Sequence, residues 1–439
     1  MKKKLITLLL ASSMLVGLLA GCGGKNAEQT TTDALTTAGQ TDTQAGIDAV
    51  TTAAVTTAAI TEEATTAEPE TTGEPVTYEV IERNGYVNTF DITDYGAVGD
   101  GVTDCTAAVQ AALDDAGRVE GTVIVPPGKY KVGQLKMHPH VRLEGDSAWS
   151  FDEDGGSVFL LNDPNATCMI DITGAFGCTI TGMSLNGQYK GEGVHGVYLN
   201  WPEYNGGGNE DTPTVEDCRI GYFTGDGVHL SHVWCFSVRH NMICFNNGSG
   251  LYIDGWDGFI LDNWFSANSN CGIYADQAGT SLSITGNRIE VNSVAGIWIR
   301  KGDLITVTGN YFDASHGPGL KLGGGSNVSG FTVTGNFFRR SGGPDKNTFE
   351  DEYENCHLFI KGATNGAVSG NTFAYGNDDS GMGPMQPYIG IYVSNSKGVV
   401  VQSNSLFQGA VEKCIVSRRN VNVLVKDNIT DLEQEVTDK

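Results

Sequence analysis

The chain is poor in basic residues and in proline. Its 439 residues include 27 Lys and Arg against 52 Asp and Glu, for a formal net charge of −25, and only 12 Pro. Contacts to nucleic-acid phosphates require a surplus of basic side chains, so we exclude a nucleic-acid partner. The 59 Gly are about twice the usual share and follow no collagen-like triplet. This composition predicts many turns joining many strands.

The cysteines lack the closely spaced C-x-x-C pairs that are typical of zinc sites. Most of them lie in apolar, strand-like runs, where cysteine behaves as a small hydrophobic residue. We therefore predict buried free thiols and no metal ligands among the nine cysteines beyond Cys22, which are Cys105, Cys168, Cys178, Cys218, Cys235, Cys244, Cys271, Cys356 and Cys414.

The N-terminus has the pattern of an export signal. Three lysines at positions 2–4 precede an apolar run over residues 5–20, and the sequence Leu19-Ala20-Gly21-Cys22 follows. A signal cleaved directly before a cysteine resembles the lipobox of bacterial lipoproteins. The resemblance implies that residues 1–21 are removed and that Cys22 carries a lipid anchor. The rest of the chain is then extracytoplasmic and attached to the cell membrane through the lipid only.

The segment after this signal differs in composition from the rest of the chain. Between residues 30 and 72 there are 16 Thr and no aromatic residue. Such a segment buries too little apolar surface to offset the entropy of ordering it. We predict a disordered tether over residues 22–77, a folded domain over 78–430 and a C-terminal tail over 431–439.

Two sequence elements recur through the folded part, the first of them at intervals of 22 to 35 residues. The first is a strand-like run that ends in an asparagine, at Asn241, Asn263, Asn287, Asn310, Asn336, Asn371, Asn404 and Asn428. The second is a glycine followed by three strand-forming residues, as in Gly227-Val-His-Leu and Gly250-Leu-Tyr-Ile. It recurs at Gly196, Gly227, Gly250, Gly272, Gly296, Gly319 and Gly390.

These repeats are too short for propeller blades and lack the leucine spacing of leucine-rich repeats. They fit a solenoid, in which each coil stacks on the next at about 4.8 Å and equivalent side chains form columns. A column of inward asparagines satisfies its amides by hydrogen bonds along the stack. We predict an all-β parallel β-helix in which the eight asparagines are structural.

The segment at 91–130 predicts how the solenoid begins. It holds a helix with Asp104 as N-cap, a strand at 122–125 and then Pro126-Pro127-Gly128. A helix that covers the first coil protects its open edge. The segment resembles the start of pectate-lyase-like proteins, the right-handed β-helix superfamily of rhamnogalacturonases, polygalacturonases and epimerases. The resemblance implies a single-stranded right-handed parallel β-helix with an N-terminal capping helix, acting on a polysaccharide.

The catalytic signatures of the best-known members of this superfamily are missing from the sequence. There is no Asn-Thr-Asp, Gly-Asp-Asp, Gly-His-Gly or Arg-Ile-Lys of polygalacturonases, no Trp-Ile-Asp-His of pectate lyases and no Asp-Pro-His-Glu of mannuronan epimerases. Pectin cleavage is therefore not established by the resemblance.

A second resemblance covers residues 262–404. The run LDNWFSANSNCGIYADQAG and the stretch from Asn336 through Asn371 are similar to the inulin fructotransferases. Those β-helix proteins work as trimers and convert fructan ends into a cyclic difructose anhydride with an Asp and a Glu. This resemblance implies a homotrimer and gives an alternative function.

The repeat also predicts a catalytic site, because equivalent residues of successive coils are neighbours. Three residues after consecutive ladder asparagines stand Glu290, Asp313 and Arg339. Two carboxylates one coil apart, at about 5 Å, suit the nucleophile and acid-base pair of a retaining glycosidase. We predict that these three residues are catalytic.

Long insertions at 339–354 and 374–386 leave the solenoid at the corner next to this column and predict a cleft wall. The residues expected there to bind substrate are His316, Arg340, Tyr375 and Asp378. A further insertion at 200–213 carries Trp201, which we expect to stack on a sugar ring.

The sequence predicts no cofactor, and one metal alternative remains. Asp254, Asp257, Asp262 and Asp276 offer the oxygen ligands that Ca²⁺ prefers. We expect a surface-anchored glycoside hydrolase or polysaccharide lyase. The alternatives are a fructotransferase and a non-catalytic β-helix that binds glycans or acts as an adhesin.

Overall fold

The computed structural model describes residues 88–437, with gaps at 148, 202–209, 344–351, 378 and 380–383. The predicted signal, the lipid anchor at Cys22 and the tether lie outside the described residues. Within the described ranges, no helix is long and apolar enough to cross a membrane.

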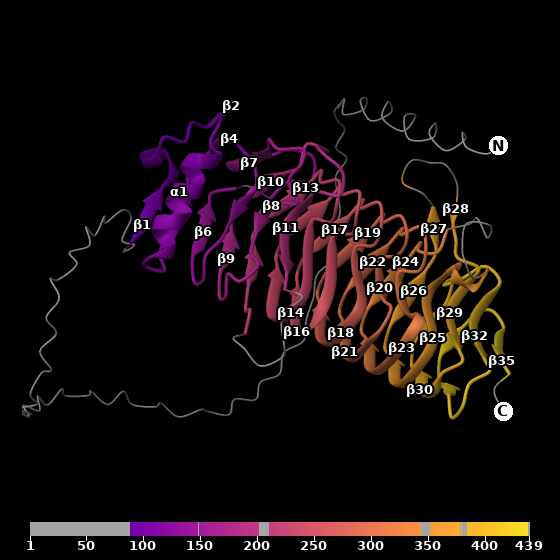
Figure 1. Ribbon diagram of the computed structural model, residues 1–439. Coiled ribbons are helices and arrows are strands. Elements are labelled where there is room, and N and C mark those ends of the chain that lie inside the picture. The colour runs from indigo at the N-terminus through magenta and orange to yellow at the C-terminus, as the bar shows by residue number, and fades with distance from the viewer. Residues whose placement is uncertain are drawn as a thin grey trace, which may run out of the picture. The chain divides into compact units, whose positions relative to one another are not determined.

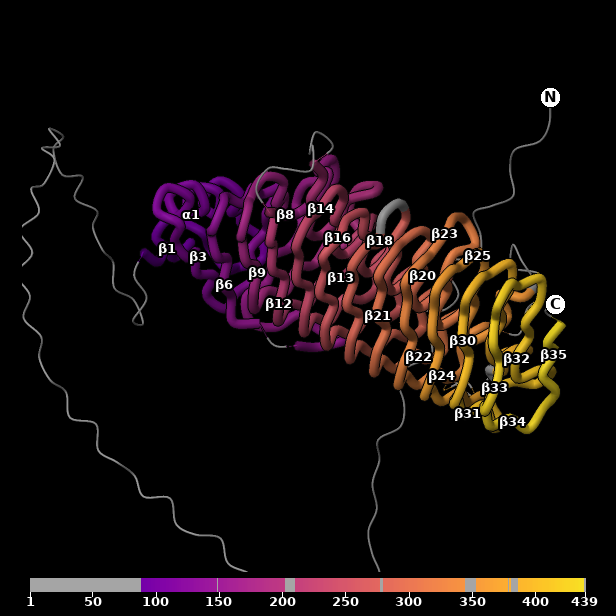
Figure 2. The backbone as a smooth tube through the Cα atoms, turned by 90° about the horizontal axis from the view of Figure 1, so that it is seen from below, coloured from indigo at the N-terminus to yellow at the C-terminus, as the bar shows by residue number. Residues whose placement is uncertain are grey.

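The described residues wind into a stack of β-coils (Figures 1 and 2). A 20-stranded sheet and a 13-stranded sheet run along the stack, and each strand pairs in parallel with its counterpart in the next coil. For example, β14 (Val228–Arg239) pairs with β16 (Leu251–Leu261), which pairs with β18 (Ile273–Thr285). This arrangement confirms the predicted parallel β-helix. A small hairpin of β27 (Gly376–Asn377) and β28 (Pro384–Met385) is antiparallel.

Each coil has three faces, because the long strands of the 20-stranded sheet bend in the middle. The coil after β18 has two strands in place of one, β20 (Ile297–Ile299) and β21 (Gly302–Thr308), and both pair with β18 and with β23 (Leu320–Thr334). In each long strand, the residues before the bend form what we call the ladder face. The residues after the bend form what we call the middle face. The third face is the 13-stranded sheet.

The remaining strands extend these faces along the chain. The 20-stranded sheet also contains β1 (Thr89–Asp91), β3 (Thr122–Val125), β5 (Leu135–Lys136), β6 (Arg142–Gly145), β8 (Cys168–Asp171), β9 (Thr179–Thr181), β11 (His195–Asn200), β12 (Thr214–Glu216), β25 (Cys356–Ser369), β29 (Ile389–Ser394), β30 (Lys397–Gln402), β32 (Lys413–Arg418), β33 (Leu424–Lys426) and β35 (Gln434–Val436). The third face consists of β2 (Asp100–Asp104), β4 (Gly128–Val132), β7 (Ser157–Leu161), β10 (Ser184–Asn186), β13 (Arg219–Gly221), β15 (Met242–Cys244), β17 (Trp264–Ser266), β19 (Arg288–Glu290), β22 (Tyr311–Asp313), β24 (Phe337–Arg339), β26 (Thr372–Ala374), β31 (Ser405–Leu406) and β34 (Ile429–Thr430). Because β35 pairs with β32, the coils continue past residue 430.

Helix α1 (Thr106–Gly117) covers the first coil, as predicted, at the indigo end of Figure 1. It buries Val109 and Leu113 completely against the core of the first strands. The N-cap residue is Cys105 and not the expected Asp104. Asp104 still contributes, because its Oδ1 accepts a hydrogen bond from the Thr106 N–H at 3.0 Å.

The eight predicted asparagines form an unbroken hydrogen-bonded ladder at the corner between the middle face and the third face. The Nδ2 of Asn287 donates to the Oδ1 of Asn310 at 2.9 Å and to the carbonyl oxygen of Ile260 at 2.9 Å. The residue before each asparagine has a positive φ, which explains the recurring glycine at that position; these residues are His240, Asp262, Gly286, Gly309, Gly335, Gly370, Ser403 and Asp427.

A second asparagine ladder, which the sequence analysis missed, runs along the corner that follows the third face. Asn246 donates to Asn268 at 3.0 Å, and Asn268 donates to Asn292 at 3.0 Å. These asparagines come five residues after members of the first ladder, so the same spacing argument finds them. The ladders hold two corners of the coil at fixed positions.

The cysteines confirm the prediction of buried thiols. All nine described cysteines are free, and all but Cys235 are buried. Burial raises the pKa of the Cys178 thiol to about 12, so this side chain stays a neutral, hydrophobic core group.

Replacing Asn287 by Ala is expected to lower the free energy of unfolding by about 2–4 kcal/mol. The change leaves the buried Asn263 N–H and the Ile260 carbonyl without their partners. Chemical denaturation measures the loss. Asn428→Ala, at the end of the ladder where the asparagine is half-buried, is the matched control and is expected to cost less. Equal losses would contradict the ladder's role.

A buried histidine makes the fold sensitive to acid. His357 has no exposed surface, and neither ring nitrogen has a partner of normal hydrogen-bond geometry within the described chain, although the backbone of Ala374 and Gly409 faces the ring. Burial lowers the pKa of His357 from 6.5 to about 3. As the pH falls, the unfolded chain therefore binds a proton at this histidine before the folded chain does, and stability is lost between pH 6.5 and about 3.

His357→Leu is expected to flatten this pH dependence, because leucine has no proton to gain and the ring makes few hydrogen bonds to lose. The midpoint of thermal unfolding, measured at intervals between the two pKa values, tests the prediction. A variant that loses stability on acidification as steeply as the wild type would contradict it.

Candidate functional site

The predicted catalytic column exists as a row on the third face. Glu290 in β19 lies opposite Asp313 in β22, and Asp313 lies opposite Arg339 in β24. The sequence spacing therefore gave the correct register for all three residues.

Each carboxylate of this row is held by its own partners. Glu290 accepts hydrogen bonds from the Arg288 Nε at 2.7 Å and from the Trp264 Nε1 at 2.8 Å. Asp313, whose side chain is only 3% exposed, accepts two hydrogen bonds from Arg340 at 2.6 and 2.5 Å. The arrangement is that of two ion-pair networks, and the catalytic role of the row stays a prediction.

Of the predicted binding residues, His316, Arg340 and Tyr375 follow the third-face strands β22, β24 and β26, and a cleft lined by them stays a prediction. Arg339 lies 3.2 Å from Asp313, and the buried Arg340 joins Asp313 to Asp379 at 2.6 Å. His316 is exposed beside Gly343, and Tyr375 is half-buried after β26. Trp201 follows β11 on the ladder face, where its ring lies 5.1 Å from that of Phe176. Asp378 lies outside the described residues.

The aspartates considered for calcium are spread around the coil. Asp254 and Asp276 lie on the ladder face, and Asp276 pairs with Arg300 at 2.6 Å. Asp257 lies beyond the bend and accepts the Trp234 Nε1 at 2.9 Å, and Asp262 occupies the positive-φ corner before Asn263. A calcium site at these residues stays a prediction that their positions do not favour.

A continuous row of large side chains runs along the outside of the ladder face. Its members occupy one register position in successive coils: Tyr198, His229, Tyr252, Tyr274, Trp298, Lys321, Phe359 and Tyr392. We call this row the aromatic ladder. The residues on either side of each member, such as Leu251 and Ile253, are buried in the core, so the row faces outward.

The rings of the aromatic ladder contact one another along the stack. The His229 and Tyr252 rings lie 4.3 Å apart with an interplanar angle of 4°, and the Tyr274 and Trp298 rings lie 5.3 Å apart. The Lys321 ammonium lies 3.8 Å from the centre of the Trp298 ring. Beyond it the ladder is covered, because Lys321 pairs with Glu354 of the short helix η3 (Glu352–Glu354) at 2.9 Å. The open part therefore ends at Trp298.

Polar residues lie beside the open part of the ladder. Ser231 lies opposite Asp254 in the next coil, and Asp276 accepts a hydrogen bond from the Tyr274 hydroxyl at 3.0 Å. Burial, reinforced by the charge of Asp276 and opposed by that of His232, raises the pKa of Asp254. The surface thus combines stacking rings with ionisable groups of both signs.

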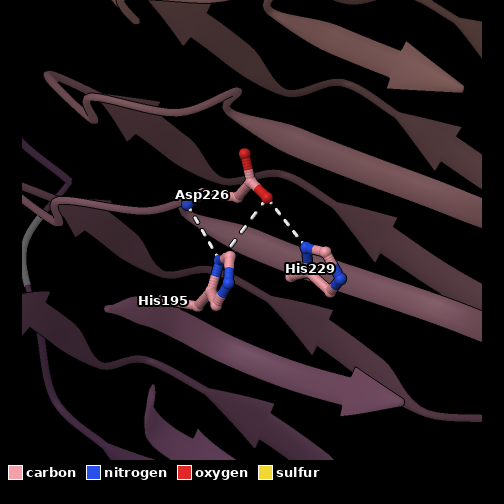
Figure 3. A group of neighbouring side chains, drawn as sticks. All are labelled: His195, Asp226 and His229. Carbon is pink, nitrogen blue, oxygen red and sulfur yellow. Dashed lines mark hydrogen bonds and ion pairs between the residues drawn. The ribbon is translucent and has the colours of Figure 1, made fainter. Parts of the chain in front are cut away.

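Two histidines and an aspartate meet at the start of this open part (Figure 3). The Asp226 carboxylate accepts the Ser249 N–H at 2.6 Å and lies 2.8 Å from the His229 Nδ1. Since a carboxylate only accepts, the Nδ1 of His229 donates this hydrogen bond, and in the neutral form of such a ring the lone pair is on Nε2. His195 accepts the Asp226 backbone N–H at 3.0 Å, and burial lowers the pKa of His195 to about 4, so it stays neutral.

These three residues are also a candidate metal site. Ligand atoms of His195, Asp226 and His229 all lie within 4.8 Å of one another. However, His195 Nδ1 already accepts a backbone hydrogen bond, and both carboxylate oxygens of Asp226 accept hydrogen bonds. The geometry fits a hydrogen-bonded Asp226–His229 pair better than a set of open ligands.

The sequence contained the signal for this site. His229, Tyr252 and Tyr274 are each the third residue of the repeated Gly-x-x element, the same element whose periodicity predicted the fold. Applying the column argument to this second element finds the aromatic ladder. Only the contact of Asp226 with His229 required the structure.

Comparison with known proteins supports the fold class. Residues 168–338 match a family model described as the right handed beta helix region. With the two parallel sheets, this match identifies the folded part as a right-handed parallel β-helix, which confirms the predicted handedness.

Among curated proteins, the chain is similar to mannuronan C5-epimerases of Azotobacter vinelandii. It is 26% identical to AlgE1 over 261 residues, which are 53% of this chain and 18% of that protein. It is 28% identical to AlgE4 over 193 residues, which are 39% of this chain and 32% of that protein. The chain thus matches less than a third of the length of either relative.

Among solved structures, the fold is similar to a DFA-IIIase from Arthrobacter chlorophenolicus A6, crystallised without its lid in complex with GF2, with a TM-score of 0.53 and 18% identity over 78% of this chain and 94% of that chain. The Dettilon tailspike protein gives a TM-score of 0.54 at 14% identity over 77% of this chain and 68% of that chain. At these identities the likeness shows the fold alone.

Replacing Arg340 by Met is expected to destabilise the fold by about 3–5 kcal/mol, because it leaves the buried Asp313 charge with a single partly exposed partner. Arg339→Met, at a side chain that is 35% exposed, is the matched control and is expected to cost about 1 kcal/mol or less. Chemical denaturation measures both. In the double variant Asp313→Leu/Arg340→Met, part of the loss is expected to be recovered; equal effects of the two single variants would contradict this assignment.

Proposed function

We propose that the chain is a surface-anchored enzyme that modifies a uronate polysaccharide by removing the proton at C5 of a sugar bound on the ladder face. The observation that carries this proposal is the Asp226–His229 pair at the start of the open aromatic ladder. The predicted lipoprotein signal supports the location, and a homotrimer remains an expectation of the fructotransferase resemblance only.

The Asp226–His229 pair has the geometry of a general base. The hydrogen bond of 2.8 Å from Nδ1 to the carboxylate fixes the ring and its tautomer, so that Nε2 is the proton acceptor. The carboxylate also stabilises the imidazolium that forms when Nε2 takes a proton. His195 stays neutral beside it and adds no competing positive charge.

Epimerisation at C5 needs a proton donor as well as a base. Burial, together with the nearby charges of Asp276 and Asp254, raises the pKa of Tyr252 to about 12. Its hydroxyl therefore keeps its proton at neutral pH and can return one to the carbanion. The ring of Tyr252 lies 4.3 Å from that of His229, and inversion at C5 requires the Tyr252 hydroxyl to act on the face of the sugar opposite the base.

The proton at C5 of a uronate is acidified when the neighbouring carboxylate is neutralised. Arg300 lies along the open ladder, fixed by Asp276 at 2.6 Å with 41% of its side chain exposed. The exposed Lys301 follows it. These cations are the groups that we assign to the substrate carboxylate, and we assign the Tyr274 and Trp298 rings to contacts with adjacent sugars.

The relatives support this reaction class over the other predictions. They are named as mannuronan C5-epimerases, and epimerisation begins with the proton abstraction that the site can perform. A β-elimination shares this first step, so a lyase is the second candidate. A retaining hydrolase would need a free carboxylate nucleophile, whereas Glu290 and Asp313 are each bound by neighbouring side chains.

The protein incubated with polymannuronate in D₂O is expected to convert mannuronate into guluronate with deuterium at C5, as read by NMR. Elimination would instead give unsaturated chain ends, and hydrolysis would give reducing ends without deuterium. Inulin, tested in parallel, would give a cyclic difructose anhydride if the fructotransferase alternative holds.

His229→Gln is expected to lower kcat by at least about 100-fold, because it removes the base. Glu290→Gln on the third face is the matched comparison and separates the two predicted sites. Full turnover in His229→Gln, or complete loss in Glu290→Gln alone, would overturn the assignment to the ladder face.

A further inference from the structure

A second row of large side chains lies on the outside of the third face. Trp264, Arg288, Tyr311 and Phe337 occupy one register position in β17, β19, β22 and β24. They face outward, because the next residue of each strand is completely buried: Phe265, Ile289, Phe312 and Phe338. This row faces away from the coil on a different sheet from the aromatic ladder.

The members of the row contact one another along the stack. The Arg288 guanidinium lies 5.0 Å from the centre of the Trp264 ring and 4.9 Å from that of Tyr311. The Tyr311 and Phe337 rings lie 5.5 Å apart with an interplanar angle of 7°. Trp149 extends the row, because its ring lies 6.1 Å from that of Trp264. We call Trp149 together with this row the platform.

The loop that carries Trp149 is held rigidly by one arginine. The side chain of Arg219 has no exposed surface, and its guanidinium donates to the carbonyl oxygens of Ser150 and Phe151 at 3.0 and 3.1 Å and to Asp154 at 2.6 Å. Trp149 nevertheless remains 41% exposed. The structure therefore fixes an exposed indole ring in place, and such preorganisation lowers the entropy cost of binding a ligand.

The charges beside the platform determine which ligand it suits. The two carboxylates of the neighbouring row are shielded, since the side chains of Glu290 and Asp313 are 13% and 3% exposed, whereas Asp379, the second partner of Arg340, is 80% exposed. The guanidinium groups face solvent, since those of Arg288 and Arg339 are 49% and 35% exposed. Arg288 and Arg339, although each is paired with a carboxylate, thus present partly exposed guanidinium groups beside aromatic rings, a combination that fits an anionic sugar.

We infer that the platform is a second binding site for a uronate polysaccharide, which lies along the stack and is held there without being converted. The choice of uronate as the sugar rests on the proposed function, whereas the binding site itself rests on the platform. Rings one coil apart, at about 4.8 Å, match a polymer whose sugars repeat along the same axis. Two polymer-binding faces on one tethered protein would retain a substrate that leaves the ladder face.

Calorimetric titration with a mannuronate hexamer counts the sites. We use the full chain with His229→Gln, which prevents turnover, and expect two hexamers per chain. Adding Trp149→Ala and Phe337→Ala, at two exposed positions, is expected to remove one of the two hexamer-binding sites. Phe259→Ala, at a middle-face side chain that is 55% exposed, is the matched control and is expected to leave both. Maltohexaose serves as the uncharged probe and is expected not to bind.

The outcomes separate this inference from the proposed function. One hexamer in the parent and none after the platform changes would uphold the platform and count against the ladder face. The inference would be overturned if the protein bound the same number of hexamers with and without the platform changes, or if it bound no hexamer at all. A change in oligomeric state, measured by sedimentation, with unaltered binding would also overturn it, because the face would then be an interface between copies of the chain.

Thermal unfolding of each variant guards against loss of the fold. Arg288→Gln provides a second test that keeps every ring in place. It is expected to weaken the platform site about ten-fold, because a guanidinium beside a bound carboxylate is lost. Unchanged affinity in that variant would contradict the anionic character of the ligand.

Discussion

The structure depends on the hydrogen bonding of each coil to the next in parallel, in a register that does not drift. The backbone alone would permit slippage, since moving a strand by one residue exchanges its inner and outer side chains. The buried asparagine ladder opposes such a shift, because every ladder amide from Asn241 to Asn404 donates to the asparagine of the next coil. A slip would leave several of these amides unsatisfied in the core, at a cost of kilocalories for each.

Because the register is constant, residues that recur along the sequence form continuous surfaces on the stack. Alternation along each strand places one set of residues in the core and the other outside, and stacking lines the outer set into rows parallel to the axis. The Gly-x-x element produces the aromatic ladder, and the strands after the asparagines produce the platform. Both rows run from coil to coil along the stack, and this geometry suits an extended polymer better than a compact ligand.

The two faces differ in how their charges are paired. On the third face, Arg340 donates hydrogen bonds to both oxygens of Asp313, so this carboxylate is held in a buried ion pair. On the ladder face, Asp226 directs one oxygen to His229, and the proton-accepting nitrogen of the histidine remains. Burial of Asp254 and Tyr252 also favours their protonated forms. Proton transfer is therefore suited to the ladder face and binding to the third face.

The sequence by itself determined the periodicity, the capping helix, the buried thiols and the register of Glu290, Asp313 and Arg339. These features follow from residue spacing and from the pattern of buried positions, and both recur in every coil. The sequence did not determine how the polar groups of the two outer rows are paired. That depends on Arg340 reaching back to Asp313 from a corner with positive φ, and on Asp226 reaching His229 across the start of a strand. Such contacts depend on the direction of side chains at the corners of the coil. The alternation of inward and outward residues, which identifies a strand in the sequence, ends at these corners, so only the tertiary structure decided these contacts.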